Sequence, residues 1–498
     1  MLLRTLLAGF QKQIKLEDIP NLPIAGVCED SRRIRPGELF VARAGTKTDG
    51  ARFLTDAQAR GAAAAVVQHA VADCSLPQIV LPDVNQAASI LANAFFDRPD
   101  RTVRVLGITG TNGKTTTTYL LRHLLGKVGV SCGMIGTVEI DDGGSRCEAE
   151  MTTPSATQIA RLLAGMRDNG CRACAMEVSS HALDQGRAAG VRFAGAAFTN
   201  LTGDHLDYHK TMDHYASSKA KLFESLDESA IAAVNDDDPY TPRMIEDCGA
   251  VIVRFGFNES ADYRAMMPAI TAAGTHFVLK TPDGQTEVSM QLIGPHNIEN
   301  ALAAATLAGE VFGLSVHQIA FGLRDAPAAP GRLQPVRCGQ PFAVLVDYAH
   351  TDDALENVLT ALRPLTRGKL RVLFGCGGDR DRTKRPRMAR TAEKLADVIY
   401  VTSDNPRTED PAGIIDEIVA GLTRSRPATV ELDRRKAIER VLGDARVGDV
   451  VLLAGKGHEN YQIVGTEKRH FDDAEEARAF LATAYAQGTG ANSSGRGE

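Results

Sequence analysis

The stretch from 103 to 118, VRVLGITGTNGKTTTT, constrains the fold of this chain more than any other part of it. Residues Val103 to Ile108 are apolar and rich in β-branched side chains, which predicts a buried strand. A glycine-rich turn follows, and apolar residues then recur at helical spacing from Tyr119 to Leu125. This order predicts a phosphate-binding loop, because the N–H groups at a helix N-terminus attract anions.

The loop departs from the strict G-x-x-x-x-G-K-[ST] pattern, because Ile108 stands at its first glycine position. Lys114 is expected to neutralise the β- and γ-phosphates, and the Thr115 hydroxyl to bind Mg²⁺. An ordinary glycine-rich turn with a surface lysine is the alternative, and the agreement of strand, loop and helix disfavours it. The residues predicted to bind ATP here are Gly110, Thr111, Asn112, Gly113, Lys114, Thr115 and Thr116.

Length and composition predict a soluble protein of several domains. At 498 residues the chain is too long for one core, and about 150 residues per domain suggests three. The net charge of −6 supplies no basic footprint, so we expect no nucleic-acid partner. No apolar run reaches about 18 residues, so we expect no membrane span. Nine scattered cysteines, an odd number, favour reduced thiols in the cytoplasm.

Short apolar runs alternate with helical patterns along the whole chain, which predicts an α/β fold with mostly parallel sheets. Two breaks, FDRPDRT at 96–102 and APAAPG at 326–331, divide it. The predicted parts are a small α/β domain at 1–98, a central ATP-binding domain at 99–333, a C-terminal Rossmann-like domain at 334–486 and a disordered tail at 487–498. Within the central domain, the turn Thr281-Pro282-Asp283-Gly284 between apolar runs predicts a hairpin.

Polar clusters follow the predicted strands of the third domain, where ligands of open parallel sheets bind. These clusters begin at Asp347, Gly375, Asp404 and Gly455. In the central domain, Glu177 ends a strand and His205 follows the next one. A carboxylate and an imidazole at the same sheet edge as Lys114 would complete a Mg²⁺ site, although imidazole is an uncommon ligand of that ion.

With these residues the chain resembles the Mur ligases, ATP-dependent enzymes that extend the peptidoglycan stem peptide, and among them the diaminopimelate-adding type. The resemblance spans about residues 25 to 485. Its markers are Asp30-Ser31-Arg32, Gly110 to Thr116, Thr152-Thr153-Pro154, Glu177 to His181, Asp204 to His209, Gly294 to Asn300, Asp347 to His350 and Asp404 to Arg407. Two departures are visible: Met151 replaces a polar residue, and Asp352 replaces a proline.

The resemblance implies three domains, which bind the UDP substrate, ATP and the amino acid. ATP would phosphorylate the γ-carboxyl of a UDP-muramoyl-L-alanyl-D-glutamate substrate, and the amine of meso-diaminopimelate would attack the acyl phosphate. Lys219 matches the lysine that the family carries as a carbamate, which helps to hold a second Mg²⁺. The implied catalytic residues are Lys114, Glu177, His205 and Lys219, and the implied metal ligands are Thr115, Glu177, His205 and carbamylated Lys219.

By the same matching, the substrate contacts divide into three groups. The UDP substrate would contact Ser31, Thr46, Lys47, Thr48, Thr152, Thr153, Ser179, Gln185 and Arg187. Asn300, Arg332 and Asp347 would hold the adenosine part of ATP. Diaminopimelate would contact Arg380, Asp404, Asn405, Pro406, Arg407, Gly455 and Glu459. The Arg407 guanidinium suits the second carboxylate that distinguishes diaminopimelate from lysine, and Glu459 can take the distal ammonium.

Two alternatives remain open. A lysine-adding or folyl-polyglutamate-type ligase is the same chemistry with another acceptor, which Arg407 and the region around Asp30 oppose. A nucleotide-binding regulator would turn ATP over slowly and without regard to added amino acid. We expect a cytoplasmic monomer with small-molecule substrates only.

Overall fold

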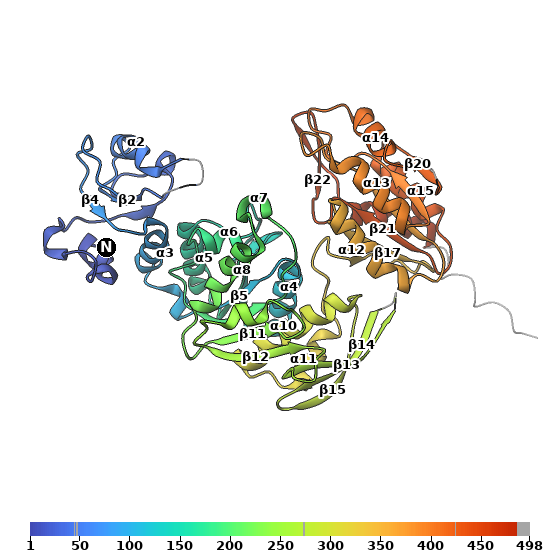
Figure 1. Cartoon of the computed structure of the whole chain (residues 1–498), viewed down its shortest axis with the longest axis horizontal. Coiled ribbons are helices and arrows are strands. Elements are labelled where there is room, and N and C mark those ends of the chain that lie inside the picture. The colour runs from blue at the N-terminus through green and yellow to red at the C-terminus, as the bar shows by residue number, and fades with distance from the viewer. Residues whose placement is uncertain (44, 46–47, 272–273, 424, 486–498) are drawn as a thin grey trace, which may run out of the picture. The chain divides into compact units, whose positions relative to one another are not determined.

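The computed structural model describes residues 1–43, 45, 48–271, 274–423 and 425–485. It divides into two compact units, coloured along the chain in Figure 1. The first unit comprises Met1–Met266, Val278–Glu287 and Glu299–Leu323, and the second comprises Met267–Phe277, Val288–Ile298 and the chain from Arg324 onward. The domain boundaries at 98 and 333 stay predictions, and the tail predicted at 487–498 lies outside the described residues.

The first unit begins with a parallel four-stranded sheet in the order β1-β2-β3-β4. Its strands are β1 (Gly26–Cys28), β2 (Glu38–Val41), β3 (Ala64–Val67) and β4 (Gln78–Val80), and its helices are α1 (Leu3–Leu6), α2 (Leu54–Ala59) and α3 (Val84–Phe95). Alternate residues of β2 face separate apolar clusters, because Leu39 packs with α3 residues and Phe40 with α2 residues. Because β1 and β2 are parallel, the loops that follow them leave the same edge of the sheet.

A larger sheet has the order β15-β14-β13-β12-β11-β10-β5-β9-β6-β7-β8. Its strands are β5 (Arg104–Thr109), β6 (Cys132–Ile135), β7 (Glu139–Asp141), β8 (Arg146–Glu148), β9 (Ala173–Glu177), β10 (Phe193–Phe198), β11 (Ile231–Asn235), β12 (Val251–Gly256), β13 (Tyr263–Thr271), β14 (Gly274–Thr281) and β15 (Gly284–Met290). In the order of the sheet, every neighbouring pair of strands from β12 through β11, β10, β5 and β9 to β6 is parallel. Strand β5 lies between β9 and β10, so these two strands flank the predicted phosphate loop.

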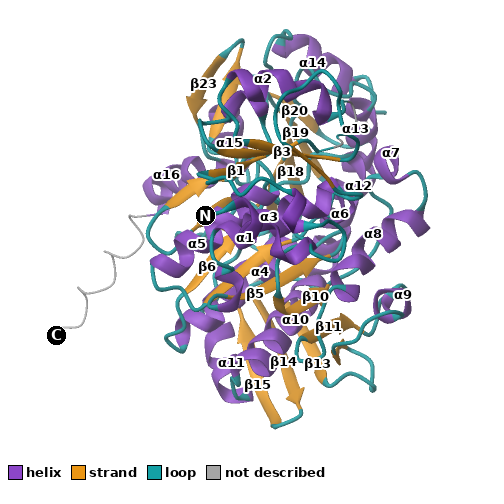
Figure 2. Ribbon diagram, turned by 90° about the vertical axis from the view of Figure 1, so that its left-hand side faces the viewer, coloured by secondary structure: helices purple, strands orange, loops and turns teal. Residues whose placement is uncertain are grey.

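Helices cover this sheet, as the ribbon view in Figure 2 shows. They are α4 (Lys114–Lys127), α5 (Ala156–Asp168), α6 (Ser180–Asp184), α7 (Leu206–His209), α8 (Met212–Glu224), α9 (Thr241–Ile245), α10 (Pro295–Phe312) and α11 (Val316–Leu323). Leu163 of α5 and Leu222 of α8 share one buried cluster with Val105 and Phe198 of the sheet. Helix α5 starts with a capping box between Ser155 and Gln158, which fixes where the helix begins.

The second unit contains a six-stranded sheet in the order β16-β17-β21-β18-β19-β20, parallel except for the pair β16–β17. Its strands are β16 (Gln334–Pro335), β17 (Ala343–Asp347), β18 (Leu370–Phe374), β19 (Val398–Val401), β20 (Ala428–Val430) and β21 (Val450–Ala454), beside a hairpin of β22 (Tyr461–Val464) and β23 (Glu467–His470). Its helices are α12 (Asp352–Leu362), α13 (Lys384–Leu395), α14 (Pro411–Val419), α15 (Arg434–Gly443) and α16 (Asp473–Tyr485). Separate apolar clusters lie on its two faces.

These sheets confirm the α/β fold with mostly parallel strands. The sequence missed β7, β8, β13 and the hairpin β22–β23, because these strands are partly or wholly exposed and carry no buried apolar run. Asp352, which stands where the resemblance led us to expect a proline, opens α12 and pairs with Arg387. An acidic residue in the first turn is favourable for a helix, so this departure is compatible with the local fold.

Candidate active site

The predicted phosphate loop joins β5 to α4 through Gly110 and Gly113. Gly113 has φ +86°, and a Cβ there would lie 2.2 Å from Asn300 Oδ1. A Cβ on Gly110 would lie 1.9 Å from Thr199 Oγ1. Asn200 holds the loop from the neighbouring strand, because its carbonyl accepts the Thr111 N–H at 2.8 Å. Both glycines are therefore required by close approach, and the loop is fixed from β10 and α10.

Lys114 folds back over this loop. Its Nζ donates to the carbonyl oxygens of Gly110 at 2.8 Å and Thr111 at 2.9 Å. Thr115 and Thr116 are buried in the first turn of α4. The ammonium group and the loop amides thus occupy one small region, as a polyphosphate site requires.

Glu177 lies at the end of β9 and is 1% exposed. Its carboxylate accepts hydrogen bonds from Thr115 Oγ1 at 3.1 Å, from Thr137 Oγ1 at 2.9 Å and from the Thr137 N–H at 2.9 Å. Two of the predicted metal ligands are therefore in contact, and both offer oxygen, the donor that Mg²⁺ prefers. Thr137 was not singled out in the sequence, because no motif marks it.

Lys219 comes from α8 and is 1% exposed. Its Nζ donates to Gly110 O at 2.8 Å and lies 4.5 Å from the centre of the Tyr215 ring. The pKa of Lys219 is well below the ordinary lysine value, first because burial disfavours the charged form and second because Lys114 is nearby. The structure thus brings Lys114 and Lys219 to the same carbonyl oxygen.

His205 is placed differently from the other predicted metal ligands. It has φ +55°, its side chain is about half exposed, and it lies 3.5 Å from Asp204. Its ring contacts His181 and approaches Tyr215, which also borders Lys219. Within the described ranges, no group of three or more His, Cys, Asp or Glu side chains is arranged to hold a metal. Thr115 and Glu177 could therefore hold an ion only together with further ligands, such as oxygens of a bound nucleotide.

The residues predicted to grip the muramoyl dipeptide form one hydrogen-bonded cluster. The Thr153 hydroxyl donates to Glu177 O at 2.8 Å and accepts the Ser179 N–H at 3.0 Å. Arg187 donates to Thr153 O at 2.8 Å and, through Nε and Nη2, to Gln185 Oε1. Thr152 joins the same network, because its hydroxyl accepts from Thr137 Oγ1 at 3.0 Å.

The residues predicted to contact the uridine nucleotide lie in the segments after β1 and β2. Ser31 is buried and opens a 3₁₀ turn capped by Asp30, whose carboxylate accepts the Arg32 N–H. Thr48 is exposed. Thr46 and Lys47 lie outside the described residues.

The predicted adenosine contacts are divided between the units. Asn300, in the first unit, accepts from Thr117 Oγ1 at 3.4 Å. In the second unit, Asp347 is buried and accepts the N–H groups of Leu333 and Ala349. Burial raises the pKa of Asp347, and Arg332 opposes that shift.

The 404–407 loop in the second unit carries the predicted amino-acid contacts. Arg407 has φ +51°, donates through Nη1 to Gly378 O at 2.8 Å, and exchanges backbone hydrogen bonds with Ile463 and Gly465 of the β22–β23 hairpin. Pro406 is buried, and Arg380 is exposed. Among the described residues, no hydrogen bond reaches buried Asp404 Oδ1, although the Lys456 ammonium lies 3.6 Å from it.

Glu459 and Asp404 share a buried cation that the sequence did not reveal. Lys456 is fully buried, with Nζ 3.5 Å from Glu459 Oε2 and 3.6 Å from Asp404 Oδ1. Burial and Asp404 raise the pKa of Glu459, and Lys456 opposes the shift. Gly455, just before this lysine, has φ +110°. Within this trio, two carboxylates lie near one ammonium group.

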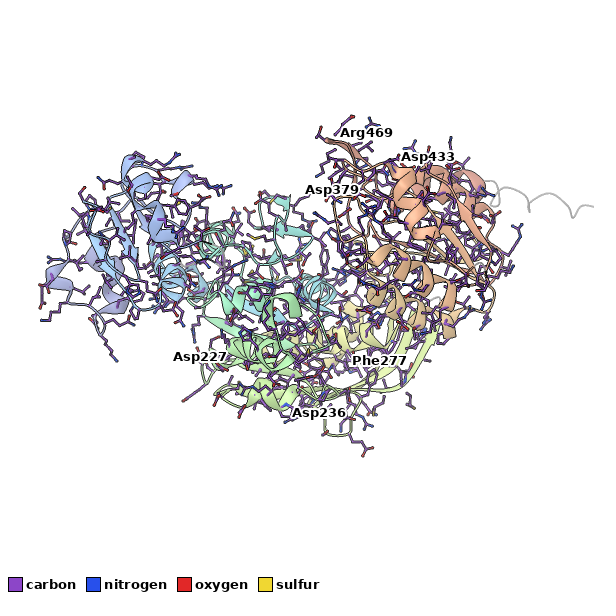
Figure 3. All side chains as sticks on the ribbon, turned by 45° about the horizontal axis from the view of Figure 1, so that its top comes forward. Asp227, Asp236, Phe277, Asp379, Asp433 and Arg469 are labelled. Atoms are coloured by element: carbon purple, nitrogen blue, oxygen red, sulfur yellow. The ribbon has the colours of Figure 1, made fainter. Side chains whose placement is uncertain are left out.

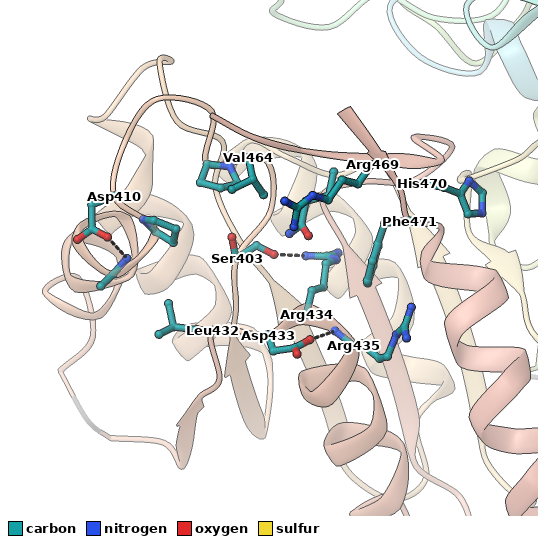
Figure 4. A pocket seen from close by; sticks show the side chains of 14 residues that line it. Ser403, Asp410, Leu432, Asp433, Arg434, Arg435, Val464, Arg469, His470 and Phe471 are labelled. Atoms are coloured by element: carbon teal, nitrogen blue, oxygen red, sulfur yellow. Dashed lines mark hydrogen bonds between the residues drawn. The ribbon is translucent and has the colours of Figure 1, made fainter. Parts of the chain in front are cut away.

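A cavity of about 570 Å³ lies beside the same loop, between the hairpin and the starts of α14 and α15 (Figure 4). Its lining includes Ser403, Pro406 and Gln462. Arg434 also lines it, is paired with buried Asp473 at 2.6 Å, and donates to Ser403 O at 3.4 Å and Ala454 O at 3.0 Å. Arg434 therefore holds the chain ends that lead into the loops at 404–407 and 455–459.

Three family models match the chain in succession. The Mur ligase family catalytic domain matches residues 23–96, the Mur ligase middle domain matches 108–308, and the Mur ligase glutamate ligase domain matches 331–457. No described helix is long and apolar enough to cross a membrane.

Curated relatives match over almost the full length. The UDP-N-acetylmuramoyl-L-alanyl-D-glutamate–2,6-diaminopimelate ligase of Gloeobacter violaceus is 45% identical over 95% of this chain and 96% of its own. The enzyme of the same name from Bacillus cereus is 41% identical over 93% of this chain and 96% of its own.

Solved structures give the same result for the fold. A 2,6-diaminopimelate ligase of the same name matches with a TM-score of 0.69 and 34% identity, covering 93% of this chain and 96% of that one. The MurF ligase of Thermotoga maritima in complex with ADP matches with a TM-score of 0.60 over 94% of this chain and 100% of that one. Its identity is 18%, so it shows likeness of fold alone.

Proposed function

The chain belongs to the Mur ligase family, and from that premise we propose that it joins meso-2,6-diaminopimelate to UDP-N-acetylmuramoyl-L-alanyl-D-glutamate. ATP drives this amide bond in peptidoglycan precursor synthesis and is converted to ADP and phosphate. The observation that carries the proposal is the 45% identity, over 95% of the chain, to a relative with that name. The enzyme acts as a cytoplasmic monomer on small molecules. Residues 1–98 bind the UDP substrate, residues 99–333 bind ATP, and residues 334–486 bind the amino acid.

The activation step explains why the phosphate loop and its cations are needed. A carboxylate acylates amines poorly because oxide is a bad leaving group, and phosphorylation replaces it with inorganic phosphate. The carboxylate must approach an anionic γ-phosphoryl group, so positive charge must offset the repulsion. Lys114 supplies part of that charge. Mg²⁺, with Thr115 and Glu177 among its ligands, supplies more when it is bound.

Lys219 is proposed to carry a carbamate. Its ammonium group first loses a proton, and the neutral amine then adds to CO₂, forming an N–C bond and releasing a second proton, so a cation becomes an anion. Burial and the depressed pKa of Lys219 support this reaction, because only the neutral amine has a free electron pair. The carbamate would serve a second Mg²⁺, and His205 is proposed as a further ligand of that ion.

The remaining assignments follow the domain order. Ser31 and Thr46 to Thr48 contact the uridine nucleotide, and the cluster of Thr152, Thr153, Ser179, Gln185 and Arg187 holds the muramoyl dipeptide. Asn300, Arg332 and Asp347 hold the adenosine part of ATP. The hydrogen bonds within the Thr153–Arg187 cluster support a site built to orient a polar chain.

Selection of the amino acid rests on charge. Asp404 and Glu459 attract an ammonium group, and Arg407 binds the distal carboxylate that lysine lacks. Arg380, Asn405, Pro406 and Gly455 complete the proposed pocket. Asp404 Oδ1 supports this assignment, because among the described residues it accepts no hydrogen bond beside its 3.6 Å ion pair with Lys456, so it can accept one from a substrate ammonium.

Phosphate release from ATP with the UDP-muramoyl dipeptide tests the function. We expect release to require meso-diaminopimelate and to be far slower with L-lysine or no acceptor. Equal release with L-lysine would favour a lysine-adding ligase, turnover of a folate substrate would favour a folyl-polyglutamate-type ligase, and acceptor-independent release would favour a regulator.

Arg407→Ala tests the pocket. We expect the KM for diaminopimelate to rise about 100-fold, because a bidentate charged contact is lost, while the KM for ATP changes little. Arg426→Ala, an exposed arginine with one distant ion pair to Asp397, is the matched control. An unchanged KM for diaminopimelate would remove Arg407 from the pocket.

A further inference from the structure

An ion pair that no motif marks connects the small N-terminal sheet to the central domain. Glu29 follows β1 and Arg43 follows β2, and these parallel strands are neighbours. Glu29 Oε2 lies 2.5 Å from Arg43 Nη1, and the two side chains are 8% and 18% exposed. Charged groups this buried are costly unless they are fully paired, so the contacts of each matter.

Both partners reach across to the central domain. Glu29 Oε1 accepts the Thr157 N–H at 2.7 Å, in the first turn of α5. Arg43 Nη2 donates to the carbonyl oxygen of Gln185 at 3.2 Å. Arg43 Nε donates at 3.2 Å to Asn85, in the first turn of α3. The pair therefore links the first turn of α5, the first turn of α3 and the carbonyl group of Gln185.

Gln185 connects Arg43 to Arg187 through hydrogen bonds to both. Two nitrogens of Arg187 donate to Gln185 Oε1, at 3.0 and 2.7 Å, and a third donates to Thr153 O. Burial lowers the pKa of Arg187, Arg43 lowers it further, and Glu29 opposes the shift. Glu29 thus compensates the repulsion that two neighbouring guanidinium groups would otherwise experience.

We propose that the Glu29–Arg43 pair is a positioning element that sets the spacing between the uridine end and the dipeptide end of the nucleotide-sugar substrate. This inference rests on the proposed function. Ser31 is two residues from Glu29, whereas Gln185 and Arg187 lie at the other end of the connection. A substrate that is held at both ends gains affinity only when the two sites keep the right separation. Arg43 acts through Gln185 and is not itself a catalytic residue.

Arg43→Ala and Glu29→Gln test the proposal in the phosphate-release assay. We expect the KM for the UDP-muramoyl dipeptide to rise about 10- to 100-fold, as for loss of a charged hydrogen-bonded contact, with kcat and the KM for ATP nearly unchanged. Inhibition by UDP alone should weaken less than about threefold, because UDP occupies one end only. Arg43→Lys should give an intermediate KM, since it keeps the charge without the fork.

Arg192→Ala is the control. Arg192 pairs with Asp227, labelled in Figure 3, at 2.8 Å, and both side chains are largely exposed. This variant should leave every kinetic constant near its wild-type value. Thermal melting of each variant checks that the chain still folds.

The possible failures are distinguishable. A wild-type enzyme without diaminopimelate-dependent phosphate release would overturn the proposed function. If the wild type is active, an unchanged KM for the UDP-muramoyl dipeptide in Arg43→Ala overturns the inference alone. An equal loss of UDP binding also overturns it, because the pair would then merely support the N-terminal fold.

Discussion

Two lysines of the proposed active site are both buried, but their electrostatic surroundings are opposite. Lys219 in the central domain is 1% exposed and Lys456 in the second unit is 0% exposed. Lys219 is hydrogen-bonded to a backbone carbonyl and lies near a second cation, Lys114. Lys456 lies between two carboxylates, those of Asp404 and Glu459.

The difference shows how burial alone does not decide what a lysine does. An amine that is buried beside another cation loses its proton easily, and the pKa of Lys219 is accordingly far below its usual range. The neutral amine is the form that the proposed carbamylation of Lys219 requires. An amine buried between acids has its charge balanced, so Lys456 instead tunes the charge of the pocket around it.

The largest expected effect follows from removing the first of these lysines. Lys219→Ala should lower kcat about 1,000-fold or more, because the proposed carbamate and the Mg²⁺ that it would hold act on the charge that develops in the transition state. ATP binding should change only a few-fold, since Lys114 and the loop amides remain. Single-turnover phosphate release and nucleotide titration measure the two quantities separately.

The chemical form of Lys219 can be measured directly. Enzyme supplied with ¹³C-bicarbonate should show one carbamate carbon resonance, and Lys219→Ala should lack it. Thorough removal of CO₂ should reduce wild-type activity, and bicarbonate should restore it. An active, CO₂-independent enzyme without this resonance would contradict the carbamate.

A smaller effect is expected from the second lysine. Lys456→Met should raise the KM for diaminopimelate about tenfold and leave the KM for ATP unchanged. Lys456 is the cation that opposes the raised pKa of Glu459, so its loss should raise that pKa further. Glu459 is then protonated at higher pH, and the acid limb of the profile of kcat/KM for diaminopimelate should move to higher pH.

The pH profile separates this role from simple structural support. A variant that merely destabilised the pocket would raise the KM at every pH without moving the limb. Lys468→Met is the comparison, because both lysines lie near the Tyr461 ring: Lys456 Nζ is 5.5 Å from the ring centre, and Lys468 Nζ is 3.9 Å from it, on an exposed strand. An unmoved limb in Lys456→Met would remove Lys456 from the electrostatics of the site.

The sequence predicted those parts of the site that depend on neighbours along the chain. The strand, loop and helix around Lys114 form one local pattern, and parallel strands bring Glu177 to the same edge. That parallel arrangement follows from the alternation of strands and helices alone. The resemblance to the Mur ligases supplied Lys219, whose burial no local pattern indicates.

The parts that the sequence missed depend on contacts between distant segments. Gly113 must be glycine because Asn300 approaches it, and Glu29 is significant only because Arg43 and Thr157 donate hydrogen bonds to it. Lys456 stood within a recognised polar cluster, yet its burial between two acids needed the fold. His205 was expected at the same sheet edge as Lys114; it contacts Asp204 and His181, and its role as a metal ligand stays a prediction.

The smallest expected effect sharpens the comparison by changing a lysine that is near Lys219 in sequence but not in environment. Lys221 is about half exposed and pairs with Asp184 at 2.9 Å. Exposed ion pairs contribute about 1 kcal/mol or less, so Lys221→Ala should change kcat and each KM less than about threefold. The same phosphate-release assay measures this. A loss as large as that of Lys219→Ala would mean that the reactive amine had been assigned to the wrong face of α8, and that burial does not select it.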